Sequence, residues 1–123
     1  MNQEYLAKNF VYEKDPQNKW KILSKDNMHG DCEDYALTAL YIETGSKFKM
    51  ALALIFGSAK MQHCLAPSGG GHVVLKYKGY YIDNGHRIWV TRRYLETKGY
   101  KFSGWRYWWL SAIIKFALSA NKV

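Results

Sequence analysis

The stretch Gly30-Asp31-Cys32-Glu33-Asp34-Tyr35-Ala36-Leu37 places a thiol at the point where a turn becomes a helix. Glycine permits a sharp turn, and an aspartate directly after it is a preferred residue at a helix N-terminus. From Tyr35 onward, apolar residues recur at helical spacing until Gly45, a residue type that commonly ends helices. We therefore predict a helix over residues 32–44, with the cysteine in its first turn.

The position of Cys32 affects its reactivity. Unpaired backbone N–H groups and the helix dipole favour a thiolate there, and the same N–H groups can hold an oxyanion. Glu33 and Asp34 act in the opposite direction, because nearby negative charge raises the pKa of a thiol. We expect a cationic side chain, most simply a histidine, to approach Cys32 from elsewhere in the fold.

Length and composition predict one folded domain over residues 1–123. The chain is 48% hydrophobic and 16% aromatic, which argues against disorder, and two cysteines are too few for a disulfide-stapled miniprotein. The net charge is +8, but the basic residues are scattered, so a solvated basic surface is favoured over nucleic-acid binding.

No segment predicts a membrane span or a secretory signal. The N-terminus lacks a basic region followed by an apolar run, and no stretch reaches the roughly 18 apolar residues that a transmembrane helix needs. We expect a soluble, cytoplasmic protein without a transmembrane segment.

The remaining sequence predicts further elements. Helical patterns occupy residues 2–8 and 91–98, and short extended segments are predicted at residues 10–12, 72–77, 80–84 and 87–90. The apolar run 50–56 suits a buried strand, and the glycine-rich run 57–71 suits a mobile loop. Residues 105–120 predict a C-terminal helix that is apolar on two sides, which allows oligomer, partner or membrane-surface contact.

Two of these segments form a predicted hairpin around Lys78-Gly79. Because side chains alternate between the faces of a strand, His72 then shares a face with Asp83, within reach of a diagonal contact. Asn84 points to the other face, so Asp83 is the predicted orienting group for His72.

A thiol at a helix N-terminus, a histidine at a strand start and a carboxylate on the paired strand form a nucleophile, base and orienting set. His72 would take the proton of Cys32, and Asp83 would fix the tautomer of the ring. The run Gly69–Gly71 lies just before the base, where backbone and substrate must approach closely.

Three motifs carry a family resemblance: residues 30–36, Gly70-Gly71-His72-Val73-Val74-Leu75, and Tyr81-Ile82-Asp83-Asn84. In order and spacing, from residue 10 to residue 97, the chain resembles the bacterial transglutaminase-like cysteine proteinases of the papain-like superfamily. The resemblance implies an α+β fold with a papain-like/transglutaminase-like core, in which the cysteine-bearing helix packs on a small antiparallel sheet.

The resemblance also implies a Cys32–His72–Asp83 catalytic triad that acts on amide bonds of a protein or peptide substrate. No cofactor is required. Some relatives bind calcium through acids flanking the cysteine, which correspond here to Asp31 and Glu33.

Other interpretations accompany this one. Zinc has a candidate ligand set in His29, Cys32 and His63-Cys64, although adjacent ligands are poorly spaced for chelation and the paired Cys-x-x-Cys pattern is absent. Cys64 alone predicts a structural thiol, and His86 a surface residue.

Three residues are candidates for a substrate or oxyanion pocket: Trp20, Asn27 and Gly71. Packing is the simpler role for Trp20, and capping is the simpler role for Asn27.

The sequence thus predicts a thiol protease or related hydrolase: a peptidase or deamidase, with transglutaminase activity as a further outcome of the same acyl-enzyme. Hydrolysis is favoured, because amine transfer needs protection of the acyl-enzyme from water. The alternative is a non-catalytic binding module that uses its basic surface and aromatic C-terminal helix.

Overall fold

The computed structural model describes residues 1–14 and 21–106 of this α+β protein. The helices are α1 (Gln3–Asn9), α2 (Cys32–Thr44), α3 (Lys47–Ile55) and α4 (Arg92–Thr97). The strands are β1 (Val11–Tyr12), β2 (His29–Gly30), β3 (Ala59–Leu65), β4 (Gly71–Tyr77), β5 (Tyr80–Ile82) and β6 (Lys101–Arg106).

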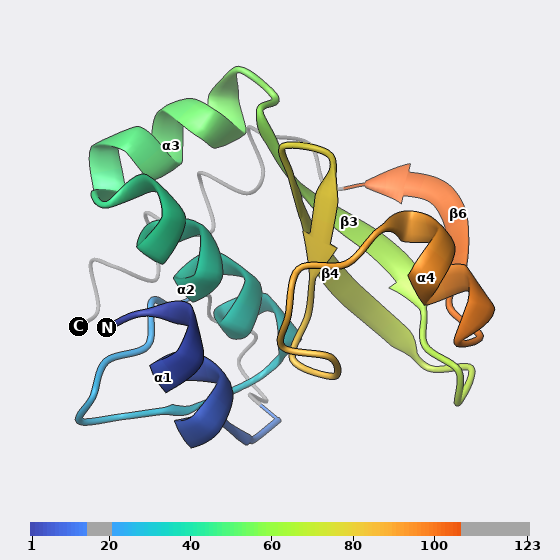
Figure 1. The fold of residues 1–123 in the computed structure, drawn as a ribbon, viewed down its shortest axis with the longest axis horizontal. Helices are drawn as coiled ribbons and strands as arrows, with labels where there is room; N and C mark the ends of the chain where they lie inside the picture. The colour runs from blue at the N-terminus through green and yellow to red at the C-terminus, as the bar shows by residue number, and fades with distance from the viewer. Residues whose placement is uncertain (15–20, 107–123) are drawn as a thin grey trace.

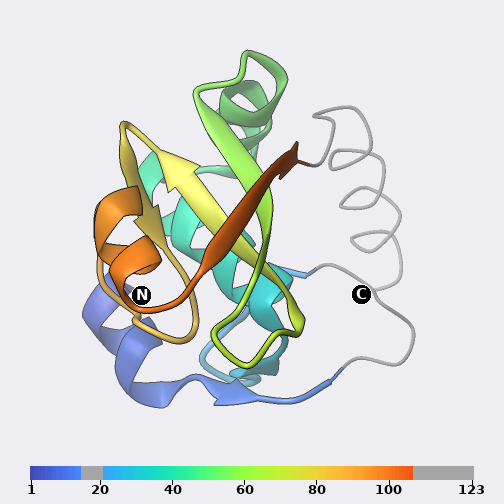
Figure 2. The ribbon, with the colours of Figure 1, turned by 90° about the vertical axis from the view of Figure 1, so that its right-hand side faces the viewer.

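A curled antiparallel sheet with strand order β5-β4-β3-β6 organises the molecule. Helices α1, α2 and α3 lie on one side of this sheet, and α4 lies on the other (Figures 1 and 2). The short strands β1 and β2 form a separate parallel pair that leads into α2. This pair fixes the chain just before Cys32.

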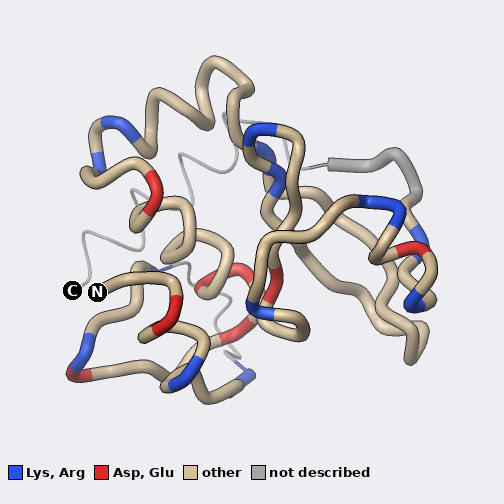
Figure 3. Tube along the Cα trace, viewed as in Figure 1, with Lys and Arg blue, Asp and Glu red and all other residues tan. Residues whose placement is uncertain are grey.

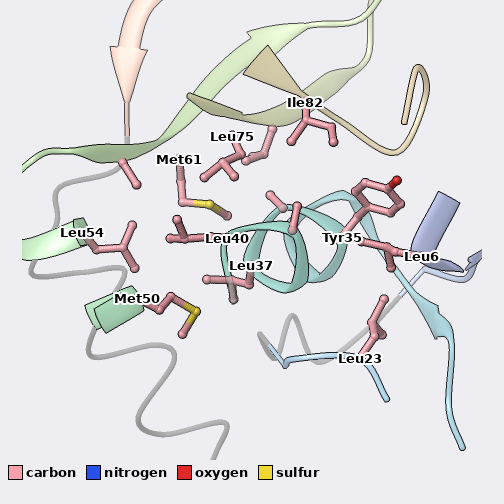
Figure 4. Close-up of a cluster of buried hydrophobic side chains, with 14 of the residues drawn as sticks. Leu6, Leu23, Tyr35, Leu37, Leu40, Met50, Leu54, Met61, Leu75 and Ile82 are labelled. Carbon is pink, nitrogen blue, oxygen red and sulfur yellow. The ribbon is translucent and has the colours of Figure 1, made fainter. Parts of the chain in front are cut away.

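Helix α2 is the centre of the main core (Figure 4). Leu37 and Leu40 are fully buried, and they pack among side chains of the sheet and of α3. On the opposite face of the sheet, Tyr81 and Leu95 belong to a smaller second core. Because β4 contributes to both cores, its alternating side chains are buried on both faces.

The predicted helix over residues 32–44 and the predicted hairpin are both confirmed. In the hairpin, Leu75 pairs with Ile82 and Tyr77 with Tyr80, and both turn residues have positive φ, as a tight hairpin requires. Strand β5 is shorter than predicted, since it ends at Ile82. The helical predictions for residues 2–8 and 91–98 are also confirmed, as α1 and α4.

The buried strand predicted over residues 50–56 is wrong, because residues 50–55 lie in helix α3 and Phe56 is its C-cap. Ser46 caps the helix by accepting a hydrogen bond from the Lys49 N–H, and Met50, Ala53 and Leu54 bury one face. Alanine, leucine and methionine are strong helix formers. Cap and propensity therefore outweigh the resemblance of this short run to a strand.

The predicted loop over residues 57–71 is also wrong in its largest part. Residues 59–65 form β3, which lies between β4 and β6 and is buried at Met61 and Cys64. Strand β4 follows after a short connection, with Leu65 paired to Gly71, but β6 comes from residues far along the chain, so this second pairing leaves no local signal. Residues 57–58 and the segment between β3 and β4 keep a loop conformation.

Two further predictions need correction. Residues 87–90 form no strand: Val90 alone makes a bridge, to Tyr81, and Arg87 has a φ of 62°, which removes it from extended geometry. The C-terminal helix predicted from Trp105 is contradicted at its start, because β6 runs to Arg106. The remainder of that predicted helix, residues 107–120, lies outside the described residues.

Charge is distributed unevenly over the described chain (Figure 3). Lysine and arginine segments occur on most elements, whereas several acidic segments gather at the beginning of α2.

Within residues 1–14 and 21–106, no helix has the length and apolar character to cross a membrane.

Candidate active site

Cys32 is the first residue of α2, and its position is fixed by a capping box. Asp31 Oδ1 accepts a hydrogen bond from the Asp34 N–H, and Asp34 Oδ2 accepts one from the Asp31 N–H, both at 3.1 Å. A Cβ at residue 30 would lie 2.6 Å from Asp34 Oδ2, so Gly30 leaves the room that this arrangement needs. The motif that predicted the helix thus also holds its N-terminus in place.

The thiol of Cys32 is partly buried and surrounded by negative charge. Burial is the largest effect and the charge of Glu33 the second, and together they raise the pKa of Cys32 to about 12. Hydrogen bonding by backbone N–H groups at Val73 and at Cys32 itself lowers the pKa but does not compensate. The expected preference of the helix N-terminus for a thiolate is therefore outweighed, and Cys32 is a neutral thiol at pH 7.

The hydrogen bond from Val73 places the sulfur of Cys32 against the beginning of β4. Val73 directly follows His72, so helix α2 brings the thiol next to the residue that carries the imidazole. Tyr12, 57% exposed, lies nearby: burial raises its pKa, as do the negative charge of Cys32 once ionised and the charge of Asp31. The thiol thus lies where α2, β4 and the exposed end of β1 approach one another.

His72 and Asp83 are joined by a hydrogen bond. The distance between His72 Nε2 and Asp83 Oδ2 is 2.8 Å, and the side chain of His72 is 13% exposed while that of Asp83 is fully buried. Asp83 directly follows β5, so the hairpin register brings the two together as the sequence predicts. Since Nε2 faces the carboxylate, Nδ1 is the ring nitrogen left for proton exchange with another group.

Asp83 accepts further hydrogen bonds that sequence reasoning missed. The Tyr100 hydroxyl donates to Oδ2 at 2.6 Å, and the His86 N–H donates to Oδ1 at 2.8 Å. Burial by itself would raise the pKa of Asp83, but the hydrogen bonds from His72, Tyr100 and His86 hold it at about 2. Asp83 is therefore an ionised carboxylate in the interior.

The prediction that His86 is a surface residue is wrong, because its side chain is only 19% exposed and faces Asp83. Tyr100 lies 17 positions from Asp83 and carries no motif of its own. Only the return of the chain after α4 brings it to the carboxylate, so no pattern in the sequence could have identified it.

The three candidate residues for an oxyanion or substrate pocket separate in the structure. Asn27 is exposed, and its Oδ1 accepts a hydrogen bond from the His29 N–H at 3.1 Å, which is a capping role within its own loop. Gly71 is the exposed first residue of β4, next to His72. Trp20 lies outside the described residues.

The candidate metal sites are incomplete. Among the described residues, no group of three His, Cys, Asp or Glu side chains is arranged to hold a metal ion. For calcium, Asp31 already uses one oxygen as a cap and Glu33 is almost fully buried, whereas calcium takes six to eight oxygen ligands. For zinc, His63 and Cys64 are successive residues of β3, so they point to opposite faces.

Cys64 also lies close to the imidazole, since it pairs with His72 across β3 and β4. It is only 1% exposed, and burial raises its pKa to about 12, with the charge of Asp83 as the second cause. This agrees with the predicted structural role. Of the two thiols, only Cys32 is within reach of a dissolved molecule.

No known protein family matches the chain in sequence, and no curated protein matches it either. Among solved structures, the fold is similar to that of calcium-bound LapG from Legionella pneumophila, with a TM-score of 0.52. The similarity covers 85% of this chain and 69% of that chain at 17% sequence identity. At this identity the likeness is one of fold.

Proposed function

We propose that residues 1–123 form one transglutaminase-like cysteine peptidase domain that acts on amide bonds of a protein or peptide. Cys32 is the nucleophile, His72 the general base and acid, and Asp83 the carboxylate that orients His72. The observation that carries the proposal is the His72–Asp83 hydrogen bond at 2.8 Å, at the strand end where the Val73 N–H meets the sulfur of Cys32. The fold-level likeness to LapG, a transglutaminase-like cysteine protease, supports it.

The raised pKa of Cys32 decides how the first step proceeds. The thiol carries its proton at pH 7, so His72 Nδ1 accepts this proton as the sulfur bonds to the carbonyl carbon. Asp83 stabilises the imidazolium that forms. The charge on the former carbonyl oxygen is held by N–H groups at the beginning of α2, with the backbone at Gly71 as a further candidate donor.

His72 then donates its proton to the leaving nitrogen, the C–N bond breaks, and a thioester on Cys32 remains. Water attacks the thioester and His72 takes its proton; the C–S bond then breaks, and His72 returns that proton to the sulfur, which releases the carboxylic acid and restores the Cys32 thiol. If the leaving group is ammonia from a carboxamide, the same steps are a deamidation. We favour these hydrolytic outcomes over amine transfer, which requires exclusion of water from the thioester.

One observation favours a different function. A thiol whose pKa is about 12 is typical of an unreactive cysteine, so the fold would serve as a non-catalytic binding module. The two functions differ in whether the reactivity of Cys32 depends on His72.

The test is alkylation of both cysteines by iodoacetamide at pH 7.5, followed by peptide mass mapping. We expect Cys32 to react, Cys64 to remain protected, and His72→Ala to slow the reaction of Cys32 about tenfold or more. His29→Ala is the matched control, because this exposed imidazole lies three residues before the thiol and pairs with Glu13 instead. Equal rates in wild type and His72→Ala would refute the catalytic proposal.

A second assay tests the reaction itself, with fluorescent casein and a glutamine-containing peptide as probes. Peptide cleavage or ammonia release should disappear in Cys32→Ser and persist in Cys64→Ser. Loss in both variants, or in neither, would contradict the assignment of Cys32 as the nucleophile.

A further inference from the structure

Tyr100 shares an oxygen of Asp83 with His72. The Tyr100 hydroxyl donates to Asp83 Oδ2 at 2.6 Å, and this is the oxygen that lies 2.8 Å from His72 Nε2. Tyr100 is 7% exposed, and its ring lies beside the imidazole of His72, with 5.8 Å between the centroids. One oxygen of the fully buried Asp83 carboxylate thus makes hydrogen bonds with both His72 and Tyr100.

The turn after α4 brings Tyr100 to this position. Gly99 has a φ of +97°, which favours glycine, and the Tyr100 N–H then donates to the carbonyl of Leu95 at 3.1 Å. Leu95 is fully buried in the second core. The end of the helix is therefore anchored, and the tyrosine ring cannot shift without disturbing that core.

Space for the hydroxyl is left by a second glycine. A Cβ at Gly85 would lie 3.0 Å from the Tyr100 oxygen and 3.2 Å from Asp83 Oδ2. These contacts are tighter than ordinary van der Waals packing, so a larger residue would press on both partners. The short connection after β5 thus leaves the carboxylate accessible to Tyr100.

We propose that Tyr100 is a positioning residue of the active site, which acts on Cys32 and His72 through Asp83. This inference rests on the proposed function. Its hydroxyl stops the carboxylate from rotating and keeps Oδ2 directed at His72 Nε2. The His72 ring is thereby held in the tautomer that carries its proton on Nε2, so the opposite nitrogen, Nδ1, is free to accept a proton.

The groups that face Asp83 limit the alternatives. His72 and Tyr100 face Oδ2, and the backbone N–H and the ring of His86 face Oδ1. Tyr100 supplies the only hydroxyl among these described partners. It donates from the turn after α4, whereas His72 lies in β4 and His86 lies in the connection after β5. Removal of the Tyr100 hydroxyl should therefore let the Asp83 carboxylate rotate more freely without removing its contact with His72.

The experiment compares Tyr100→Phe, which keeps the ring, with Tyr80→Phe, which removes a hydroxyl from an exposed side chain. Carbon-detected NMR titration of the Asp83 carboxyl should show a pKa about one unit higher in Tyr100→Phe. Alkylation of Cys32 by iodoacetamide at pH 7.5 should slow about threefold to tenfold. Tyr80→Phe should match the wild type in both measurements.

A double variant separates positioning from packing. If Tyr100 acts through Asp83, then Asp83→Asn combined with Tyr100→Phe should react no more slowly than Asp83→Asn alone. Additive losses, or an unchanged rate in Tyr100→Phe, would overturn the inference. Gly85→Ala is a second variant that presses on the same contact, and it should also slow alkylation.

The proposed function fails in a different way. If wild type and His72→Ala react equally fast, the imidazole does not activate Cys32 and the proposed function is refuted. If His72→Ala is slow but Tyr100→Phe equals wild type, only the role of Tyr100 is refuted.

Discussion

Replacement of Asp83 by asparagine should destabilise the protein in a way that depends on pH. The side chain is fully buried and keeps its negative charge through donors from His72, Tyr100 and His86. Asparagine has nearly the same shape, but it lacks the charge and turns an amide NH₂ toward one of these donors. The substitution therefore removes a charge effect, which depends on pH, and adds a donor clash, which does not.

The charge effect can be calculated from the pKa of Asp83, which falls from its ordinary value of 3.8 to about 2 in the folded protein. This shift corresponds to about 2 kcal/mol of stability, present above about pH 4 and lost as the pH falls through 2. The donor clash costs about 1–3 kcal/mol more at every pH. Near neutral pH, Asp83→Asn should thus be about 3–5 kcal/mol less stable than wild type.

Urea unfolding at pH 6 and pH 2.5 measures both parts. The stability difference between wild type and Asp83→Asn should shrink by about 1.5 kcal/mol at the lower pH, because protonation of the Asp83 carboxyl in the unfolded wild-type chain, where its pKa is 3.8, stabilises the unfolded state. Asp26→Asn is the control, since this exposed carboxyl should change stability by no more than about 0.5 kcal/mol. An equal difference at both pH values would refute the reasoning that Asp83 is held ionised by its neighbours.

Two further substitutions test the N-terminus of α2. Glu33→Gln removes the second largest cause of the raised pKa of Cys32. The pH profile of Cys32 alkylation should therefore move to lower pH, and the rate at pH 8 should rise about threefold or more. An unchanged pH profile would contradict this expectation. Gly30→Ala places a Cβ 2.6 Å from Asp34 Oδ2 and should cost about 1–2 kcal/mol in urea unfolding by breaking the capping box. Gly70→Ala, where a Cβ meets only the Ser68 hydroxyl oxygen at 3.8 Å, should leave the unfolding midpoint unchanged, and equal losses in both variants would show that the cap is not the cause.

The sequence predicted the elements whose signals are local. The helix over residues 32–44 is specified by its cap, its apolar spacing and Gly45, and the hairpin by Lys78-Gly79 between alternating segments. The contact between His72 and Asp83 followed from these, because the hairpin register alone puts both side chains on one face.

Helix α3 and strand β3 were not predicted. Residues 50–56 are apolar enough for a strand or a helix, and the cap at Ser46 with burial against α2 decided for α3. Residues 59–65 pair with β4 across a short connection and with the distant β6, and the second pairing encloses β3 within the sheet. A short apolar run has no period of its own that could settle such a choice.

Local sequence patterns specify where the thiol, the imidazole and the carboxylate lie along the chain's helices, strands and turns, since caps, periodicity and turn chemistry act within a few residues. The environment of each group depends on how these elements pack together. The raised pKa of Cys32, the burial of Cys64 opposite His72, and the Tyr100 hydroxyl on Asp83 all arise from packing between distant segments. Desolvation and long-range hydrogen bonds depend on what covers a side chain, and no local pattern of residues carries that information.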